Sequence, residues 1–235
     1  MYPVYTYFYE ARQNFMLRWS MTIKKSAKPK TYHHGNIHQE SIKWGLTFLE
    51  KGRPDFSLRE IAEKIGVTHG ALNRHFGSKN GLLAQIAEEG FKNFNDYLEQ
   101  STIAGTLSEQ FYEMARSYIR FSLDYPCHYR LMLGGKIPDH EKFEGMKEQG
   151  ERAFHQLVGL IAQMQEKEVI SQGDPLKRAY AVWSGVHGLV MLATEGYMDF
   201  DKQDGQTKDK TSKETLALSL EVVDIFTKSI LNGFK

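Results

Sequence analysis

Between residues 57 and 79 the chain concentrates polar side chains that can hydrogen-bond to a base edge or to a phosphate. Asparagine can pair bidentately with adenine, and arginine is the commonest partner of guanine. On a helix that begins after a threonine cap, these groups fall on one outward side, which contains Thr68, His69, Gly70, Asn73 and Arg74. Such a helix fits the major groove of DNA, which is about 12 Å wide. The segment therefore predicts contact with double-stranded DNA.

Two short helices and a tight turn must position this side. Ser57 followed three residues later by Glu60 forms a capping box, which predicts the start of the first helix. Its apolar face consists of Leu58, Ile61, Ala62 and Ile65. Gly66 accepts the sharp turn, Val67 fills the core beneath it, and Thr68 caps the second helix. This spacing is typical of a helix-turn-helix.

The rest of the sequence also predicts helices, and no alternating strand pattern occurs. Before the helix-turn-helix, helical spacing covers residues 37–49, and a further helix begins after Ser78. Beyond residue 100, helical spacing covers residues 111–125, 128–133, 141–170, 176–198 and 214–231. Residues 199–213 are polar and predict an exposed loop. We expect an all-α fold with a three-helix DNA-binding domain at 31–81 and a helical domain at 82–235.

Charge is unevenly distributed along the chain. Residues 21–81 contain eleven Lys and Arg against five Asp and Glu, whereas residues 82–235 contain 17 against 23. A basic head on an acidic body is typical of a phosphate-binding protein, and ordinary patchiness is the alternative. No apolar run approaches the roughly 18 to 20 residues of a membrane-spanning helix, so we expect no membrane association.

The only cysteine, Cys127, excludes an intrachain disulfide and a multi-cysteine metal site. This cysteine content fits a reducing cytoplasm. For Cys127 itself we favour a small buried apolar side chain over a redox sensor.

Residues 1–20 do not resemble a targeting segment, because they lack the basic start and the cleavage site of a signal peptide. Met21 is followed by Lys24, Lys25, Lys28 and Lys30, which predict a flexible basic arm. We therefore treat residues 1–30 as an N-terminal extension and arm, with a hypothetical translation start at Met21. An additional helix packed on the body is the alternative.

The segment from Ser57 to Lys79 resembles the helix-turn-helix of the TetR family of bacterial repressors. Residues 32–36 and 126–132, and the run from Trp183 to Gly188, resemble a subgroup with a Trp-x-x-x-His-Gly motif. The resemblance implies a homodimeric transcriptional repressor that binds an inverted-repeat operator and that a ligand releases. By position it implies base reading by Arg59, Thr68, His69 and Gly70 and phosphate contacts by His75 and Lys79.

Several of these assignments leave alternatives open. Asn73 stands where the family usually has a tyrosine, so it could contact a phosphate, pair with adenine or make no contact. Arg59 and Lys79 could be solvated charges, Arg74 could pair with a local acid, and His75 could be a core histidine. We expect His33 and His34 in the arm to reach the DNA backbone or a minor groove.

In the helical body, the resemblance implies a cavity for a small apolar or aromatic ligand and a dimer interface. We expect the cavity at Tyr118, Phe121, Met132, Trp183 and His187, with plain core packing as the alternative. The dimer interface would use the apolar residues of the last two helices, namely Val182, Val186, Leu189, Val190, Ala193, Leu216, Leu218, Leu220, Val223, Phe226 and Ile230.

Catalytic and metal chemistry find little support in the sequence. None of the nucleophile-elbow, zinc-protease, dinucleotide-binding or phosphate-loop motifs occurs, so we expect no enzyme activity and no cofactor. His34 and His38 have a metal-ligand spacing, but no cysteine or carboxylate stands at a matched spacing, and we expect no metal site. The alternative to a DNA-binding regulator is a helical ligand-binding or interaction protein whose helix-turn-helix no longer binds DNA.

Overall fold

The computed structural model describes residues 37–195, 197–198 and 212–234. The predictions for the arm, for His33 and His34, for a start at Met21 and for residues 199–211 therefore lie outside the described residues. Within them every element is helical, which confirms the all-α fold.

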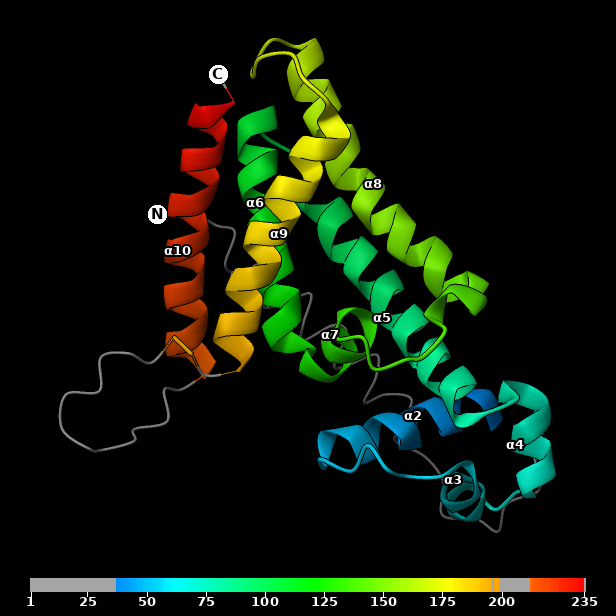
Figure 1. Cartoon of the computed structure of the whole chain (residues 1–235). Helices are drawn as coiled ribbons and strands as arrows, with labels where there is room; N and C mark the ends of the chain where they lie inside the picture. Colours follow the sequence, from blue (N-terminus) through cyan, green and yellow to red (C-terminus); the bar gives the residue numbers. More distant parts are fainter. Residues whose placement is uncertain (1–36, 196, 199–211, 235) are drawn as a thin grey trace, which may run out of the picture. The chain divides into compact units, whose positions relative to one another are not determined.

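The head consists of α2 (Ile37–Glu50), α3 (Leu58–Ile65), α4 (His69–Phe76) and the start of α5 (Lys79–Ser101) (Figure 1). The predicted capping box begins α3: Ser57 Oγ accepts from the Glu60 N–H at 3.2 Å, and the Glu60 carboxylate accepts from the Ser57 N–H at 2.7 Å. Gly66 ends α3 with a φ of 71°, a left-handed conformation that favours glycine. These local interactions confirm the predicted helix-turn-helix.

The body contains α6 (Leu107–Asp124), α7 (Pro126–Leu133), the short 3-10 helix η2 (His140–Lys142), α8 (Glu144–Glu166), α9 (Pro175–Thr194) and α10 (Ser212–Gly233). Figure 1 shows α5 beside α8, and α9 between α10 and α8. α6 begins four residues before the predicted start because Thr106 and Glu109 form a second capping box. α8 begins later than predicted because η2 precedes it.

Helix α5 links the head to the body. The predicted domain boundary between residues 81 and 82 falls inside α5, and the division into two domains stays a prediction. On the head side, α2 lies so close to α5 that a Cβ on Gly45 would be 2.8 Å from Ile86 Cδ1. On the body side, a Cβ on Gly90 would be 2.7 Å from Met132 Sδ of α7. The two glycines therefore allow α2 and α7 to pack tightly against the same helix.

No helix in the described part of the chain is both long enough and apolar enough to cross a membrane.

Candidate DNA-contacting surface and ligand cavity

Helix α4 presents one buried and one exposed side. Leu72 is fully buried and Phe76 is nearly so, which anchors the helix on the core of the head. Thr68 caps the helix, because its side chain accepts from the Ala71 N–H at 3.3 Å. The five outward residues of the sequence analysis are all exposed: Thr68, His69, Gly70, Asn73 and Arg74. The structure thus places them together on one solvent-facing surface, which we call the α4 surface.

The turn beneath the α4 surface follows the predicted pattern with one difference. Ala62, predicted to be small where α3 and α4 cross, is 2% exposed. The Val67 N–H donates to the Ala62 carbonyl oxygen at 3.0 Å, which holds the turn. Val67 packs against the core but is only half-buried. It therefore covers the edge of the head core rather than filling its centre.

The three remaining residues of the described head that are predicted to contact DNA differ in exposure and in the partners that they already have. Arg59 lies 3.5 Å from the Glu63 carboxylate, and its side chain is 81% exposed. His75 is exposed, so it is not the packed core histidine of the alternative interpretation. Lys79 Nζ donates to the Pro54 carbonyl oxygen at 2.5 Å and lies 4.7 Å from the centre of the Phe56 ring. A phosphate would have to share Lys79 with these partners.

An ion pair that the sequence analysis missed fixes the loop before α3. Arg53 donates to the Glu60 carboxylate at 2.7 Å and lies 5.0 Å from the centre of the Phe48 ring. The Arg53 hydrogen bond, with those from Ser57, lowers the pKa of Glu60 to about 2. Arg53 therefore stabilises the head itself. The pair is seven residues apart, which is longer than the three- or four-residue spacing by which ion pairs on a helix are recognised in a sequence.

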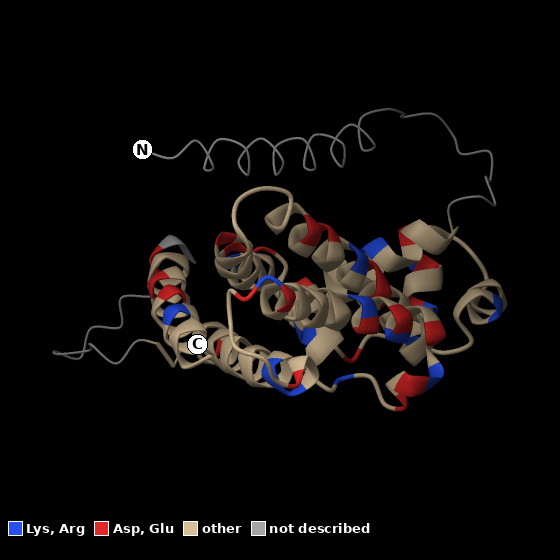
Figure 2. Ribbon diagram, turned by 90° about the horizontal axis from the view of Figure 1, so that it is seen from above, with Lys and Arg blue, Asp and Glu red and all other residues tan. Residues whose placement is uncertain are grey.

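The basic excess of the head is smaller in the described residues than in the sequence. Four of the eleven basic residues counted between residues 21 and 81 precede residue 37. In the described helices, Lys and Arg are interspersed with Asp and Glu (Figure 2). The described helices of the head therefore contain no extended basic patch.

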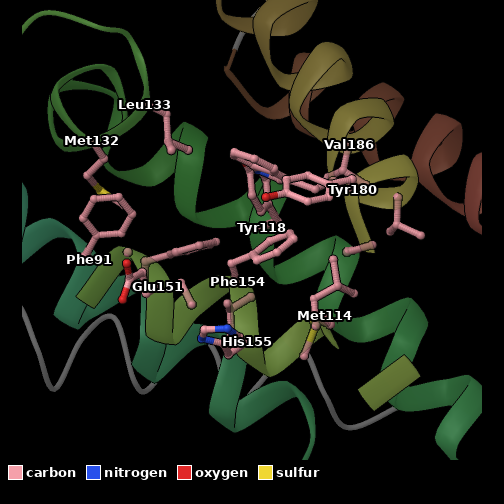
Figure 3. Close-up of a pocket in the computed structure, with 18 of the residues that line it drawn as sticks. Phe91, Met114, Tyr118, Met132, Leu133, Glu151, Phe154, His155, Tyr180 and Val186 are labelled. Atoms are coloured by element: carbon pink, nitrogen blue, oxygen red, sulfur yellow. The ribbon is translucent and has the colours of Figure 1, made fainter. Parts of the chain in front are cut away.

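The body contains a cavity of about 710 Å³, partly open to solvent, between α5, α6, α7, η2, α8 and α9. Its walls are mainly apolar side chains, and the largest of them are aromatic residues and methionines such as Phe91, Phe94, Phe111, Met114, Met146 and Phe154. Figure 3 shows Phe154 between the Phe91 and Met132 side of the cavity and the Tyr180 and Val186 side. A lining of this kind suits a largely apolar ligand.

The structure separates the predicted ligand residues into two groups. Tyr118, Met132 and Trp183 line the cavity. Phe121 does not line it, because its ring is fully buried against Phe94 and the neighbouring aromatic residues of the core. His187 does not line it either and lies behind the wall, bonded to two tyrosines. Phe121 and His187 are therefore not among the residues that line the cavity, and their part in ligand binding stays a prediction.

A hydrogen-bond chain connects the cavity wall to His187. Trp183 Nε1 donates to the Tyr118 hydroxyl at 3.1 Å, and the Tyr118 and Tyr129 hydroxyls lie 3.2 Å apart. The Tyr129 hydroxyl lies 2.6 Å from His187 Nδ1. Burial lowers the pKa of His187, which favours the neutral ring, and raises the pKa of Tyr118 to about 12. A neutral ring has its proton on one nitrogen only, and Nδ1 accepts from the tyrosine hydroxyls in the tautomer with the proton on Nε2.

The predicted dimer residues are largely used inside the subunit. Val182, Val186, Leu189, Val190, Ala193 and Val223 are buried, and Leu216, Leu220, Phe226 and Ile230 pack half-buried against the core. A different apolar side of α9 and α10 is exposed, where Met191, Leu192 and Ile225 are 39%, 48% and 67% exposed. The small residues Ala181, Ser184, Gly188 and Ala217 of the same two helices are also exposed. We call these seven exposed residues the α9–α10 surface.

Solved structures with the same fold include a protein of unknown function from Rhodococcus sp. RHA1. Its TM-score is 0.69 at 25% identity, over 88% of this chain and 99% of that chain. The TetR family transcriptional regulator PfmR from Thermus thermophilus has a TM-score of 0.57 at 22% identity, over 85% of this chain and 98% of that one. AibR, solved in complex with isovaleryl coenzyme A and operator DNA, has a TM-score of 0.55 at 16% identity, over 79% and 97%.

Relatives by sequence match a shorter region. The HTH-type transcriptional regulator Rv1816 of Mycobacterium tuberculosis is 24% identical over 95 residues, or 39% of this chain, and the match spans 41% of that relative's length. Residues 47–86 match the family model of bacterial regulatory proteins of the tetR family. Residues 111–217 match the model of the tetracyclin repressor-like C-terminal domain. Because these two models describe the head and body of one family and together match more than half of the residues, the chain belongs to the tetR family of bacterial regulatory proteins.

Proposed function

We propose that the chain is a homodimeric transcriptional repressor that binds an inverted-repeat operator in double-stranded DNA and that a small apolar ligand releases. The observation that carries the DNA-binding part is the α4 surface: a capped, anchored helix whose polar side is exposed. A recognition helix reads the major groove with such a side. The match to the helix-turn-helix model of the family supports the same assignment.

Binding to selected DNA tests this proposal. Duplexes would be selected from a random library with the full chain, and the affinity for the selected and for random duplexes would be compared in rising salt. We expect tight binding to the selected duplex, which an excess of random duplex does not displace. Equal affinity for selected and random duplexes would favour the alternative of a helical protein whose helix-turn-helix no longer binds DNA.

Replacing Arg74 with alanine is expected to cost about 1 to 3 kcal/mol of binding to the selected duplex, because a base contact is lost. The affinity for random DNA should change much less. Fluorescence anisotropy with both duplexes measures the two effects. Lys142→Ala is the matched control, because Lys142 is a similarly exposed cation in the body. A similar loss on both duplexes from Arg74→Ala would instead make Arg74 a phosphate contact.

For the dimer we propose the α9–α10 surface as the interface. Its small residues allow two copies of α9 to approach closely, and its exposed leucine, methionine and isoleucine side chains would be buried. A two-fold axis would place two α4 helices about 34 to 36 Å apart, which matches half-sites one helical turn apart.

Leu192→Arg is expected to weaken dimerisation about 10- to 100-fold, because a charge would be buried in an apolar interface. Sedimentation over a concentration series measures the shift to monomer, and the affinity for an inverted repeat should fall with it. Ile103→Arg is the matched control, because Ile103 is 78% exposed and lies outside the α9–α10 surface. A Leu192→Arg protein that stays dimeric at the same concentrations as Ile103→Arg would exclude this interface.

For the ligand, the 710 Å³ apolar cavity is the support. AibR, a structural neighbour, was solved with both isovaleryl coenzyme A and operator DNA. For the ligand to release the protein from DNA, the cavity and the α4 surface must be coupled by a free energy of about 1 to 3 kcal/mol.

A further inference from the structure

Two polar side chains of the cavity wall, those of Tyr118 and Trp183, differ from the other polar ones because they are not exposed to solvent. His140, Lys147, Glu151, His155 and Tyr180 also line the cavity and are exposed, so water satisfies them. Among the described lining residues, Tyr118 and Trp183 are the polar ones that are not exposed. Their polar atoms bond to each other and, through Tyr118, to Tyr129 and His187. A buried polar group of a ligand can therefore form hydrogen bonds with Tyr118 and Trp183 without competition from bulk water.

The direction of the chain limits which ligand group can break it. Each hydroxyl has one proton, and the Tyr129 hydroxyl is closer to His187 Nδ1, at 2.6 Å, than the Tyr118 hydroxyl is, at 3.1 Å. With the His187 proton on Nε2, Tyr129 therefore donates to Nδ1, and the Tyr118 proton is left for Tyr129. A ligand donor could use the remaining lone pair of Tyr118 and leave the chain intact. A ligand acceptor, such as a carbonyl oxygen, obtains the Tyr118 proton only by removing it from Tyr129.

Tyr129 belongs to α7, the helix between the cavity and the head. Three residues further along α7, Met132 both lines the cavity and touches α5 at Gly90. The same helix also contacts α2 directly. α5 itself packs on α2 at Gly45. A shift of α7 would thus be transmitted to the head through two contacts.

We propose that the Trp183–Tyr118–Tyr129–His187 chain is the ligand sensor, and that the effector is an apolar molecule with a carbonyl acceptor that takes the Tyr118 proton and frees α7. This inference rests on the proposed function and names the class of its ligand. In the ligand-free protein these hydrogen bonds join α7, through Tyr129, to α6 and α9. An acceptor on the ligand takes the proton that Tyr118 donates to Tyr129. Tyr129 of α7 then keeps only its hydrogen bond to His187 of α9.

Calorimetry with two probes of nearly equal shape tests the ligand class without DNA. The probes are 2-acetylnaphthalene, which has a carbonyl acceptor, and 2-ethylnaphthalene, which has none. The wild-type chain is expected to bind the ketone about fivefold to tenfold more tightly. Tyr118→Phe should abolish this preference, whereas Tyr112→Phe, the same change on α6 outside the chain and the cavity, should keep it. Equal affinities in the wild type, or a preference that persists in Tyr118→Phe, would overturn the ligand class.

DNA release tests the sensor. Tyr129→Phe removes the central hydroxyl of the chain, at a residue that does not line the cavity. This variant should behave as if ligand were bound: its affinity for the selected duplex falls about fivefold or more, and the ketone releases no further DNA. A variant that retains wild-type DNA affinity and full release by the ketone overturns the sensor. A wild-type chain that binds no duplex overturns the proposed function, and the calorimetric result still decides the ligand class.

Discussion

Phe121→Ala is expected to lower the free energy of unfolding by about 3 to 5 kcal/mol, the range for removing a fully buried phenylalanine. The Phe121 ring is fully buried, with its centre 5.0 Å from that of Phe94, 5.5 Å from Tyr97 and 5.3 Å from Tyr125. Because these rings fix one another, the space left by Phe121 can close only partially. Urea denaturation monitored by circular dichroism measures the loss.

Phe154→Ala is the comparison that separates core from cavity wall. Phe154 is half-buried and lines the cavity, so part of its surface already lacks packing partners. We expect a smaller loss of stability than for Phe121→Ala and a clear change in the affinity for 2-acetylnaphthalene. A loss of under about 1 kcal/mol for Phe121→Ala would mean that Phe121 is not the core residue that its burial indicates.

The contrast between these two phenylalanines shows what sequence reasoning reaches. Helical spacing predicts which side of a helix is apolar, and it placed Phe121 correctly on the apolar side of α6. Helical spacing does not say whether an apolar side chain packs against another side chain or faces a cavity. That depends on helices that lie far away in the sequence. Phe154 was missed for the same reason: its partners Tyr180 and Trp183 lie on α9.

Local motifs, by contrast, were sufficient for the head. The capping box at Ser57, the left-handed Gly66 and the Thr68 cap each depend on residues within four positions, so the sequence contains all the partners. A capping box of the same kind at Thr106 and Glu109 was visible in the sequence and would have corrected the start of α6. Lys79 shows the limit, because its partner Pro54 is 25 residues away.

The second large effect concerns His128, which lies on α7. A Cβ on Gly90 of α5 would be 3.2 Å from His128 Cδ2, so the half-buried imidazole packs against α5. Burial lowers the pKa of His128 from its ordinary value of 6.5 to about 4. The unfolded chain therefore binds a proton near pH 6.5, whereas the folded chain does so only near pH 4. Acid thus favours the unfolded chain over this interval.

We expect the free energy of unfolding to fall by roughly 3 kcal/mol as the pH drops from 6.5 to 4, since one pKa unit corresponds to about 1.36 kcal/mol. His187 adds to the loss in the same direction, because burial lowers its pKa too. The low pKa of Glu60, about 2, adds a further loss only as the pH falls below its ordinary value of 4.5, so the interval from pH 6.5 to 4.5 separates the two contributions. Denaturation at a series of pH values measures the slope.

His128→Gln identifies the source of that slope, because the amide does not titrate. The variant should be less stable at pH 7, where it lacks the packing of the imidazole, and its stability should fall much less between pH 6.5 and 4.5. His155→Gln is the control, because His155 is exposed and its loss should leave the slope unchanged. A slope that His128→Gln does not reduce would mean that water reaches the ring between α5 and α7. The close packing of α7 on α5, on which the proposed transmission to the head depends, would then be incorrect.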